Sequence, residues 1–278
     1  MSLKLESLNT WGGRLYEPLI SHVVEQAREG VDVFCFQEVS ATTSVRTHTD
    51  AAADIDPLSP VSDEHASRAD LYKQLLGVLP EFQGAHRVTQ TGIDFNGPVA
   101  YDLQFGLATF VRSTLPVLAE GDTFVFGAYN AQRGADCATM GRNMQFTTFA
   151  YDGRLVTAAN LHGLWHPSGK GDTPDRIVQS RKVIDFLAHI GSEVILCGDF
   201  NLLPGTDSIR MIEQAGLRNL VTEYGVQSTR SVRYDKPTKL GSYIFTSPGI
   251  IVEDFRTLKV DVSDHLPLHI TCSVEDNA

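Results

Sequence analysis

Short apolar runs that lead directly into polar residues recur along this chain. The clearest is the run at residues 194–197, which is followed by Gly-Asp-Phe-Asn at residues 198–201. A short apolar run bounded by turn residues predicts a buried strand. Residues two apart in an extended chain point to the same side, so Asp199 and Asn201 are expected together where this strand ends. The alternative is that Asp199 only caps the turn and Asn201 only tolerates a left-handed backbone.

Hydrophobic periodicity predicts further elements on both sides of this run. Apolar runs and alternating positions predict strands at residues 4–9, 31–36, 83–90, 103–111, 123–126, 143–150, 155–160, 243–246, 250–260 and up to residue 272. Apolar positions at helical spacing predict helices at residues 18–29, 67–79, 173–187 and 206–214. Asp152 and Gly153 lie between two predicted strands and indicate a hairpin turn. Strands and helices in this order predict an α/β fold built in layers.

A polar, alanine-rich and acidic stretch interrupts the pattern around residues 40–66. Because a compact domain rarely contains more than about 15 residues without regular structure, we expect a long surface loop here, of a kind that often has a functional role. A chain of 278 residues is compatible with one domain of sandwich architecture. We therefore expect a single domain over residues 1–278.

Composition and charge narrow the class of protein. Hydrophobic residues make up 42% of the chain and charged residues 21%, as in soluble globular proteins. The formal net charge of -11 argues against a broad basic surface that grips nucleic acid, although a divalent cation can supply positive charge locally. No apolar run approaches the roughly 20 residues of a membrane span. The four cysteines show no CxxC spacing, and Cys35, Cys197 and Cys272 are expected to be buried thiols in strands. We expect a monomeric, cytoplasmic protein, with an exported form as the alternative.

Polar residues that can carry chemistry gather at the ends of the predicted strands. Those that follow a strand are Asn9, Glu38, Asn160, His162, Asp199 and Asn201, and those that precede the last strand are Asp264 and His265. Ligand sites in layered α/β proteins form where several strand ends converge. Carboxylate and amide oxygens suit Mg²⁺, with Mn²⁺ as the alternative, and such a cation is completed by water and substrate phosphate. The pattern therefore predicts a divalent-metal site for phosphoryl chemistry.

These residues belong to an ordered set of motifs. The motifs are Leu8-Asn9-Thr10-Trp11, Gln37-Glu38-Val39, Asn160-Leu161-His162, Gly198-Asp199-Phe200-Asn201 and Ser263-Asp264-His265-Leu266-Pro267. In this order they resemble the endonuclease/exonuclease/phosphatase superfamily, and the resemblance spans residues 8–268. It implies an α/β (α+β) fold of two packed mixed, mainly antiparallel sheets flanked by helices, which together form a four-layer sandwich.

The resemblance also implies roles around the metal and the attacking water. Glu38 is expected to be the principal metal ligand, with Asn9 and Asp264 close to the metal. Asp199 is expected to orient or deprotonate the attacking water, and Asn201 to hold that aspartate or the phosphate. Each residue taken alone has a simpler interpretation, such as an ion pair for Glu38 or a cap for Asp264.

Further residues are expected to contact the phosphate and the leaving group. By the same resemblance, His265 hydrogen-bonds a non-bridging phosphate oxygen. His162 matches a histidine that deoxyribonuclease-like members use near the leaving group, where an imidazole can act as a general acid. Asn160 is expected to contact the substrate. Arg142, Arg176 and Arg230 are candidate phosphate ligands because a planar guanidinium suits phosphate, and solvated surface charges are the alternative.

One position departs from the family pattern. Family members usually carry Asp-Tyr where this chain has Ser242 and Tyr243, so Ser242 stands where a histidine-orienting aspartate is expected. A neutral hydroxyl can hydrogen-bond an imidazole, but it stabilises the protonated ring less than a carboxylate does. The departure is consistent with weaker activity, with a carboxylate borrowed from Asp235 or Asp261, or with a misalignment by one residue.

The combined expectation is a Mg²⁺-dependent phosphoric ester hydrolase. It would cleave a phosphodiester by attack of an activated water, as nucleases and phosphodiesterases do. The alternatives are a sphingomyelinase-type or phosphomonoesterase-type activity, or a weakly active homologue that serves as a phospholigand-binding module. The substrate is open among nucleic acid, nucleotide, lipid and small phosphoesters.

Overall fold

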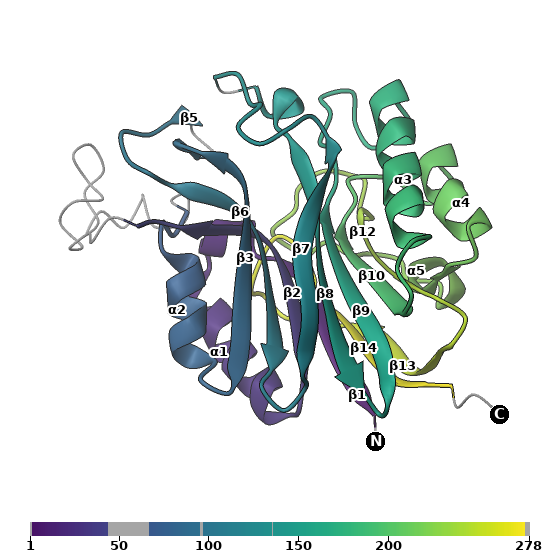
Figure 1. Ribbon diagram of the computed structural model, residues 1–278. Coiled ribbons are helices and arrows are strands. Elements are labelled where there is room, and N and C mark those ends of the chain that lie inside the picture. The colour runs from purple at the N-terminus through teal and green to yellow at the C-terminus, as the bar shows by residue number, and fades with distance from the viewer. Residues whose placement is uncertain (1, 44–66, 95–96, 135, 276–278) are drawn as a thin grey trace.

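Two six-stranded sheets pack face to face between two sets of helices (Figure 1). The computed structural model describes residues 2–43, 67–94, 97–134 and 136–275. The helices outside the first sheet are α1 (Tyr16–Arg28) and α2 (Leu71–Val78), and those outside the second are α3 (Pro174–Leu187), α4 (Asp207–Gln214) and α5 (Leu220–Glu223). The predicted four-layer sandwich of the α/β (α+β) class is confirmed.

The strands of each sheet come from distant parts of the chain. The first sheet contains, in spatial order, β13 (Ile250–Thr257), β14 (Leu268–Val274), β1 (Leu3–Asn9), β2 (Val33–Ala41), β6 (Gln104–Arg112) and β3 (Phe82–Thr91). The second contains β11 (Arg218–Asn219), β12 (Ser242–Thr246), β10 (Glu193–Asp199), β9 (Arg154–His162), β8 (Arg142–Tyr151) and β7 (Val117–Phe126). A small hairpin, β4 (Ile93–Asp94) and β5 (Gly97–Pro98), lies apart from both sheets. The 3₁₀ turns are η1 (Trp11–Gly13) and η2 (Cys137–Thr139).

One parallel strand pair lies at the centre of each sheet. In the first sheet β1 runs parallel to β2, with Asn9 opposite Gln37. In the second sheet β9 runs parallel to β10, with His162 opposite Asp199. The other pairings within the two sheets are antiparallel, as the expected mixed sheets require. Since the carboxyl ends of parallel strands meet at the same edge, each central pair brings its terminal polar residues together.

Alternation along β2 explains the two apolar layers around the first sheet. Phe34 and Phe36 pack toward α1 and α2, whereas Val33 and Cys35 face the second sheet. Successive side chains of a strand point to opposite faces, so an uninterrupted apolar run is buried on both sides. The core between the sheets is therefore continuous with the apolar faces of β9 and β10.

The second strand differs from its prediction in a way that matters for the site. It was expected to end at residue 36, but β2 continues to Ala41 through a register shift between Gln37 and Val39. Glu38 is the extra residue of this bulge and has φ of +60°. A bulge locally bends a strand and redirects a side chain. Residues 44–66 of the loop predicted around residues 40–66 lie outside the described residues.

Two further predictions can be compared with the structure. Asp152 (φ +49°) and Gly153 (φ +73°) join β8 to β9 in the predicted tight hairpin, since a type I′ turn requires positive φ at both positions.

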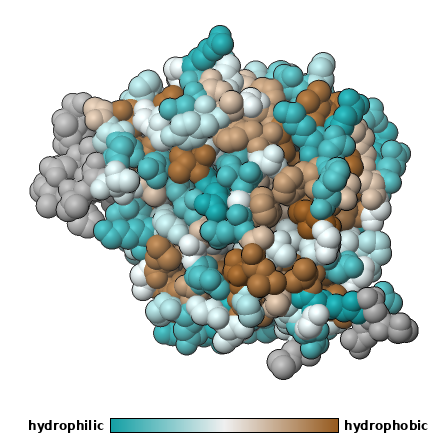
Figure 2. Space-filling model, viewed as in Figure 1, coloured by the Kyte–Doolittle hydropathy of each residue, from teal (hydrophilic) through white to brown (hydrophobic). Residues whose placement is uncertain are grey.

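Among the described helices, none combines the length and apolar character needed to span a membrane. Figure 2 shows polar and apolar residues interspersed over the face seen in Figure 1. The two continuous apolar clusters consist of buried residues.

Candidate active site

Three adjacent strands of the second sheet present polar residues in one row. Asp199, the last residue of β10, pairs with His162 on β9 and with Ser242 on β12. Sheet register therefore fixes the order Ser242, Asp199, His162 across the carboxyl end of β10. The backbone of Gly198 approaches Leu161 so closely that an added Cβ would lie 1.9 Å from the Leu161 carbonyl oxygen. Only glycine allows this packing directly before Asp199.

Asn9 joins the two sheets at this edge. Its Nδ2 donates to Glu38 Oε1 at 2.9 Å and to Asp199 Oδ2 at 3.3 Å. Its Oδ1 accepts a hydrogen bond from the backbone N–H of Trp11 at 3.0 Å. Asn9 was expected to lie near a metal, and the structure turns its amide N–H groups toward the two carboxylates. It therefore orients Glu38 instead of presenting an oxygen beside it.

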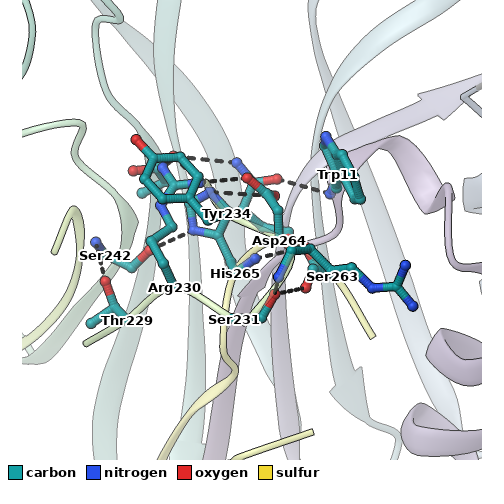
Figure 3. Close-up of polar contacts among 12 residues, drawn as sticks. Trp11, Thr229, Arg230, Ser231, Tyr234, Ser242, Ser263, Asp264 and His265 are labelled. Carbon is teal, nitrogen blue, oxygen red and sulfur yellow. Dashed lines mark hydrogen bonds and ion pairs between the residues drawn. The ribbon is translucent and has the colours of Figure 1, made fainter. Parts of the chain in front are cut away.

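Arg230 holds two carboxylates together. Its NH1 lies 2.8 Å from Asp264 Oδ2, and its NH2 lies 3.5 Å from Asp199 Oδ2. The ring of Tyr234 covers the guanidinium, with 4.3 Å between Arg230 Cζ and the ring centroid (Figure 3). Buried ion pairs need such geometry, because desolvation of the charges opposes their attraction. Arg230 was expected to contact phosphate, and in the structure its charge is already engaged by Asp199 and Asp264.

His265 is held from both its ring and its backbone. Ser242 Oγ lies 2.9 Å from His265 Nδ1 (Figure 3). His265 Nε2 lies 3.4 Å from Asp199 Oδ2. The His265 backbone N–H donates to Ser263 Oγ, which itself donates to the Asn9 carbonyl oxygen at 2.7 Å. The motif before β14 is thus tied to the end of β1.

The three carboxyl groups differ in acidity. Burial, together with the charges of Asp264 and Asp199, raises the pKa of Glu38 to about 7. Burial also raises the pKa of Asp264, although Arg230 opposes this. Burial acts in the same direction on Asp199, but His265 and Arg230 outweigh it and hold the pKa of Asp199 well below its usual range. Asp199 is therefore ionised at neutral pH, whereas Glu38 lacks a compensating charge.

Two basic side chains face the same space, and neither donates a hydrogen bond to a carboxylate among the described residues. His162 Nε2 lies 3.7 Å from Glu38 Oε1, and burial with the nearby charge of Arg142 lowers the pKa of His162 to about 3. Arg142 is only 3% exposed, and its Nε has no hydrogen-bond partner among the described residues. Burial lowers the pKa of Arg142 as well. A buried guanidinium with unused donors fits an anionic ligand.

These side chains line a cavity of about 640 Å³. The predicted site residues on its wall are Glu38, Arg142, His162, Asp199, Asn201, Arg230, Asp264 and His265. The structure thus brings together residues that are up to 227 positions apart in the chain, from Glu38 to His265. Asn9 and Ser242 lie behind this wall and hold Glu38 and His265.

Asn160 is a third predicted residue that does not line the cavity. Its side chain is fully buried between the sheets, where Oδ1 accepts from Gln37 Nε2 at 2.7 Å and Nδ2 donates to the carbonyl oxygens of Phe36 and Ala108. The hydrogen-bonding groups of the amide are satisfied there, so it joins the two sheets. The expected substrate contact of Asn160 is therefore not supported by its position.

Asn201 both forms a local turn and lines the cavity, so it fits both interpretations of its motif. Its φ is +55°, and its backbone N–H donates to Asp199 Oδ1 at 3.0 Å, which is a local turn of the expected kind. Its Nδ2 donates to the Gly163 carbonyl oxygen at 3.3 Å, and the residue also lines the cavity. The turn therefore fixes the orientation of the Asp199 carboxylate.

The donor set fits a hard divalent cation. Glu38 Oε2 is buried and has no hydrogen-bond partner among the described residues. Asp264 raises the pKa of Glu38, so a cation beside the two carboxylates would relieve their repulsion. Within the described ranges, no group of three or more His, Cys, Asp and Glu side chains could hold a metal. Mg²⁺ commonly uses only one or two protein carboxylates, with water and phosphate as the remaining ligands.

Residues 7–265 match the model of the Endonuclease/Exonuclease/phosphatase family. The chain belongs to this family. The match covers nearly the whole chain and includes every predicted site residue. Comparison with curated protein sequences gave no significant match.

Solved structures show the same endonuclease/exonuclease/phosphatase fold. A family protein from Leptotrichia buccalis has a TM-score of 0.70 at 17% identity, with 99% of this chain and 100% of that chain covered. D. rerio TDP2 complexed with single strand DNA product has a TM-score of 0.64 at 16% identity, with coverage of 98% and 99%. A mannosyl-6-phosphatase from Bacteroides thetaiotaomicron has a TM-score of 0.64 at 18% identity, with coverage of 98% and 99%.

The cavity of this family member has further wall residues, and of these only Trp11 belongs to one of the motifs. Both tryptophans of the chain, Trp11 and Trp165, line it, and Trp165 is 39% exposed. Lys170 and Tyr234 also line it. The sequence offered a weak signal for two of these residues, because Trp165 and Lys170 follow His162 in a segment rich in glycine and proline. Tyr234 carried no signal, since only the fold places it over Arg230.

Proposed function

We propose that this chain is a Mg²⁺-dependent phosphoesterase that hydrolyses a phosphodiester by attack of an activated water. Membership of the Endonuclease/Exonuclease/phosphatase family supports a phosphoric ester hydrolase. The observation that carries the proposal is the cavity in which Glu38, Asp199 and Asp264 meet the buried guanidinium of Arg142, whose Nε has no hydrogen-bond partner among the described residues. Carboxylates for a cation beside donors for an anion are what phosphoryl transfer requires.

Glu38 and Asp264 would hold the cation. Bound there, Mg²⁺ supplies positive charge that stabilises phosphoryl oxygens and makes water more acidic. Asn9 keeps Glu38 in place through its 2.9 Å hydrogen bond. Arg230 keeps Asp264 in place, and the bulge in β2 directs Glu38 into the cavity.

Asp199 accepts the proton of the attacking water in this proposal. Its low pKa keeps it ionised, and hydrogen bonds from Asn9 and the Asn201 backbone fix its orientation. A carboxylate held from both sides can direct one water toward phosphorus without rearrangement. His265, next to Asp199, donates from its ring to a non-bridging phosphate oxygen, and Ser242 sets the angle of that ring.

His162 serves the leaving group. As a general acid it must carry a proton, and its low pKa in the free protein derives from burial and from Arg142. A phosphate bound to Arg142 offsets that charge and raises the pKa of His162 toward the neutral range. Substrate binding and protonation of His162 are therefore coupled through Arg142.

A metal-dependence assay tests the proposal. We would measure hydrolysis of bis(p-nitrophenyl) phosphate with Mg²⁺, with Mn²⁺ and with chelator, for the wild type, Asp199→Asn and Asp254→Asn. Asp199→Asn keeps the shape of the side chain but removes its basicity, and should lower the rate at least about 100-fold. Asp254 is half-exposed on the edge strand β13 and is the matched control, whose replacement should change nothing.

The substrate panel adds p-nitrophenyl phosphate, single-stranded oligonucleotides and sphingomyelin. Turnover of the monoester alone would show that the substrate is a phosphomonoester, the class that the name mannosyl-6-phosphatase indicates for the Bacteroides thetaiotaomicron protein. Turnover of sphingomyelin alone would indicate a lipid substrate. If no substrate is hydrolysed with either metal, the enzymatic proposal is wrong and a phospholigand-binding module takes its place.

A further inference from the structure

Lys170 is a buried cation in the cavity wall that the motifs leave without a role. It is 9% exposed and lies in the loop between β9 and α3. Its Nζ donates to the Leu240 carbonyl oxygen at 2.7 Å. Among the residues that the structure describes, no carboxylate lies within ion-pair distance of this ammonium. An ammonium has three donors, so this single bond leaves two without a protein partner.

Hydrogen bonds fix the backbone of the loop around Lys170. Arg176 is fully buried, and its NH1 donates to the carbonyl oxygens of Gly169 and Gly171 on either side of Lys170. The Lys170 carbonyl oxygen itself accepts from the Leu203 backbone N–H at 2.9 Å. Arg176 was expected to contact phosphate, but its guanidinium instead hydrogen-bonds this loop on both sides of Lys170, so the fold fixes the backbone position of Lys170.

The Lys170 ammonium lies beside Asp199. A Cβ added to Gly241 would lie 2.8 Å from Lys170 Nζ and 3.5 Å from Asp199 Oδ1. The ammonium and the carboxylate therefore approach the same side of Gly241, and the absence of a side chain at residue 241 leaves room for both. Tyr234 bounds this space, with its ring centroid 5.1 Å from Lys170 Nζ.

The charge of Lys170 is uncompensated in the free protein. Burial and the neighbouring charge of Arg230 lower the pKa of Lys170 to about 8, and Asp199 and Asp264 only partly oppose them. A charged group that is buried without a partner destabilises the fold, and an anion bound beside it reverses that effect. Hydrophobic stabilisation alone does not explain why a lysine occupies this position.

We propose that Lys170 binds a non-bridging oxygen of the scissile phosphoryl group, beside the carboxylate of Asp199. For its substrate this inference rests on the proposed phosphoesterase function. Lys170 brings a second protein cation to the phosphate besides Arg142, because Arg230 is engaged by Asp199 and Asp264. The ammonium also lies where negative charge accumulates as water attacks, so it stabilises the transition state electrostatically.

Phosphate binding provides a test that needs no turnover. We would measure the rise in Tm caused by inorganic phosphate, and the Kd of phosphate by calorimetry, for the wild type, Lys170→Met and Lys182→Met. Lys182 is an exposed lysine on α3 and serves as the control. Lys170→Met should raise the Kd of phosphate at least about tenfold, whereas Lys182→Met should match the wild type. Where the wild type hydrolyses an ester, Lys170→Met should also lower kcat/KM by a similar factor. Lys170→Arg should restore part of the phosphate affinity.

Gly241→Ala tests the same contact from the other side. The new Cβ would push the ammonium away and should weaken phosphate binding in the wild type. In the Lys170→Met background the same change should have no further effect, because the two substitutions then act on one contact. A structural role for Lys170 would lower Tm without changing the response to phosphate, and that result would overturn the inference. Failure of the wild type to hydrolyse any ester would instead overturn the proposed function, since phosphate binding is measured separately.

Discussion

Ser242 Oγ lies 2.9 Å from Nδ1 of His265, in the position where the family pattern predicts an aspartate. The two residues come from β12 and from the turn before β14, and both are buried. Ser242 also pairs with Asp199 across the sheet. The residue expected to orient the histidine therefore does contact it, and Asp261, which was considered as a substitute, is instead paired with Arg233 at 2.8 Å.

Ser242→Asp should not lower phosphodiester hydrolysis. A carboxylate at this position would hold the His265 ring as the hydroxyl does and would favour its protonated form, which binds phosphate more strongly. Ser242→Ala should lower kcat/KM about fivefold, because the ring loses a hydrogen-bond partner worth about 1 kcal/mol. Steady-state kinetics on bis(p-nitrophenyl) phosphate measure both variants. A loss above tenfold in Ser242→Asp would refute the assignment of this position.

His162→Gln should affect esters according to their leaving group. Nitrophenolate leaves without protonation, so the variant should retain most of its activity on bis(p-nitrophenyl) phosphate. An alkyl leaving group needs the proton, and hydrolysis of a dinucleotide should fall at least about 100-fold. Equal losses on both substrates would show that His162 binds or orients the phosphate and does not act as a general acid.

Glu38→Gln should abolish the stabilisation of the fold by Mg²⁺. Burial and the charges of Asp264 and Asp199 raise the pKa of Glu38 from its ordinary value of 4.5 to about 7. Between these values the unfolded chain loses the proton while the folded protein keeps it, so the metal-free wild type loses stability as the pH rises. A cation that binds only the folded protein at 100 times its Kd adds about 2.7 kcal/mol.

Thermal unfolding at pH 8, with and without Mg²⁺, separates these contributions. The wild type should show a clear rise in Tm on addition of Mg²⁺, and Glu38→Gln should show little. Without metal, Glu38→Gln should be at least as stable as the wild type at this pH, because it removes an uncompensated charge. An equal response of both proteins to Mg²⁺ would place the cation elsewhere.

Glu6 forms a second buried ionisable cluster, away from the cavity. Its Oε1 lies 2.8 Å from His22 Nε2 on α1, and its Oε2 lies 3.9 Å from His269 Nδ1 on β14. Burial raises the pKa of Glu6, but the contacts with His22 and His269 outweigh it and lower the pKa below the ordinary value of 4.5. The stability that this carboxylate contributes is therefore present above pH 4.5 and is lost as the pH falls further.

Glu6→Gln should lower the free energy of unfolding by about 2 kcal/mol at neutral pH, since it leaves buried polar groups without a matching partner. It should not change kcat/KM of the folded enzyme. Glu17→Gln is the control, because Glu17 is 81% exposed on the same helix that carries His22. Urea denaturation at pH 7 and at pH 4 measures the effect, and a smaller difference between wild type and Glu6→Gln is expected at pH 4.

The spacing of apolar residues along the chain was sufficient to predict most helices and strands, because burial of one face imposes a repeat on the residues of each element. The alternation in residues 4–9 and the continuous run in residues 31–36 predicted β1 and the start of β2. The short elements around the cavity, such as β4 and η2, gave no periodic signal, since they have too few residues to form a pattern.

The motif residues predicted where chemistry gathers, but they did not determine which side chains would face the cavity. Asn160 and His162 lie two apart on β9 and point to the same side, yet Asn160 is used between the sheets while His162 reaches the cavity. The contacts of Arg230 also depend on an isolated antiparallel β-bridge between the backbones of Arg230 and His265, which no local sequence pattern indicates.

The sequence by itself determined the layered fold and the strand ends at which carboxylates, amides and histidines accumulate, because burial imposes a repeat on neighbouring residues. Only the tertiary structure decided that Glu38 lies in a bulge, that Arg230 binds Asp199 and Asp264, and that Lys170 reaches the side of Gly241 next to Asp199. These relationships join residues far apart in the chain. Their energies depend on strand register and on the desolvation of charges, and neither is encoded in a local pattern.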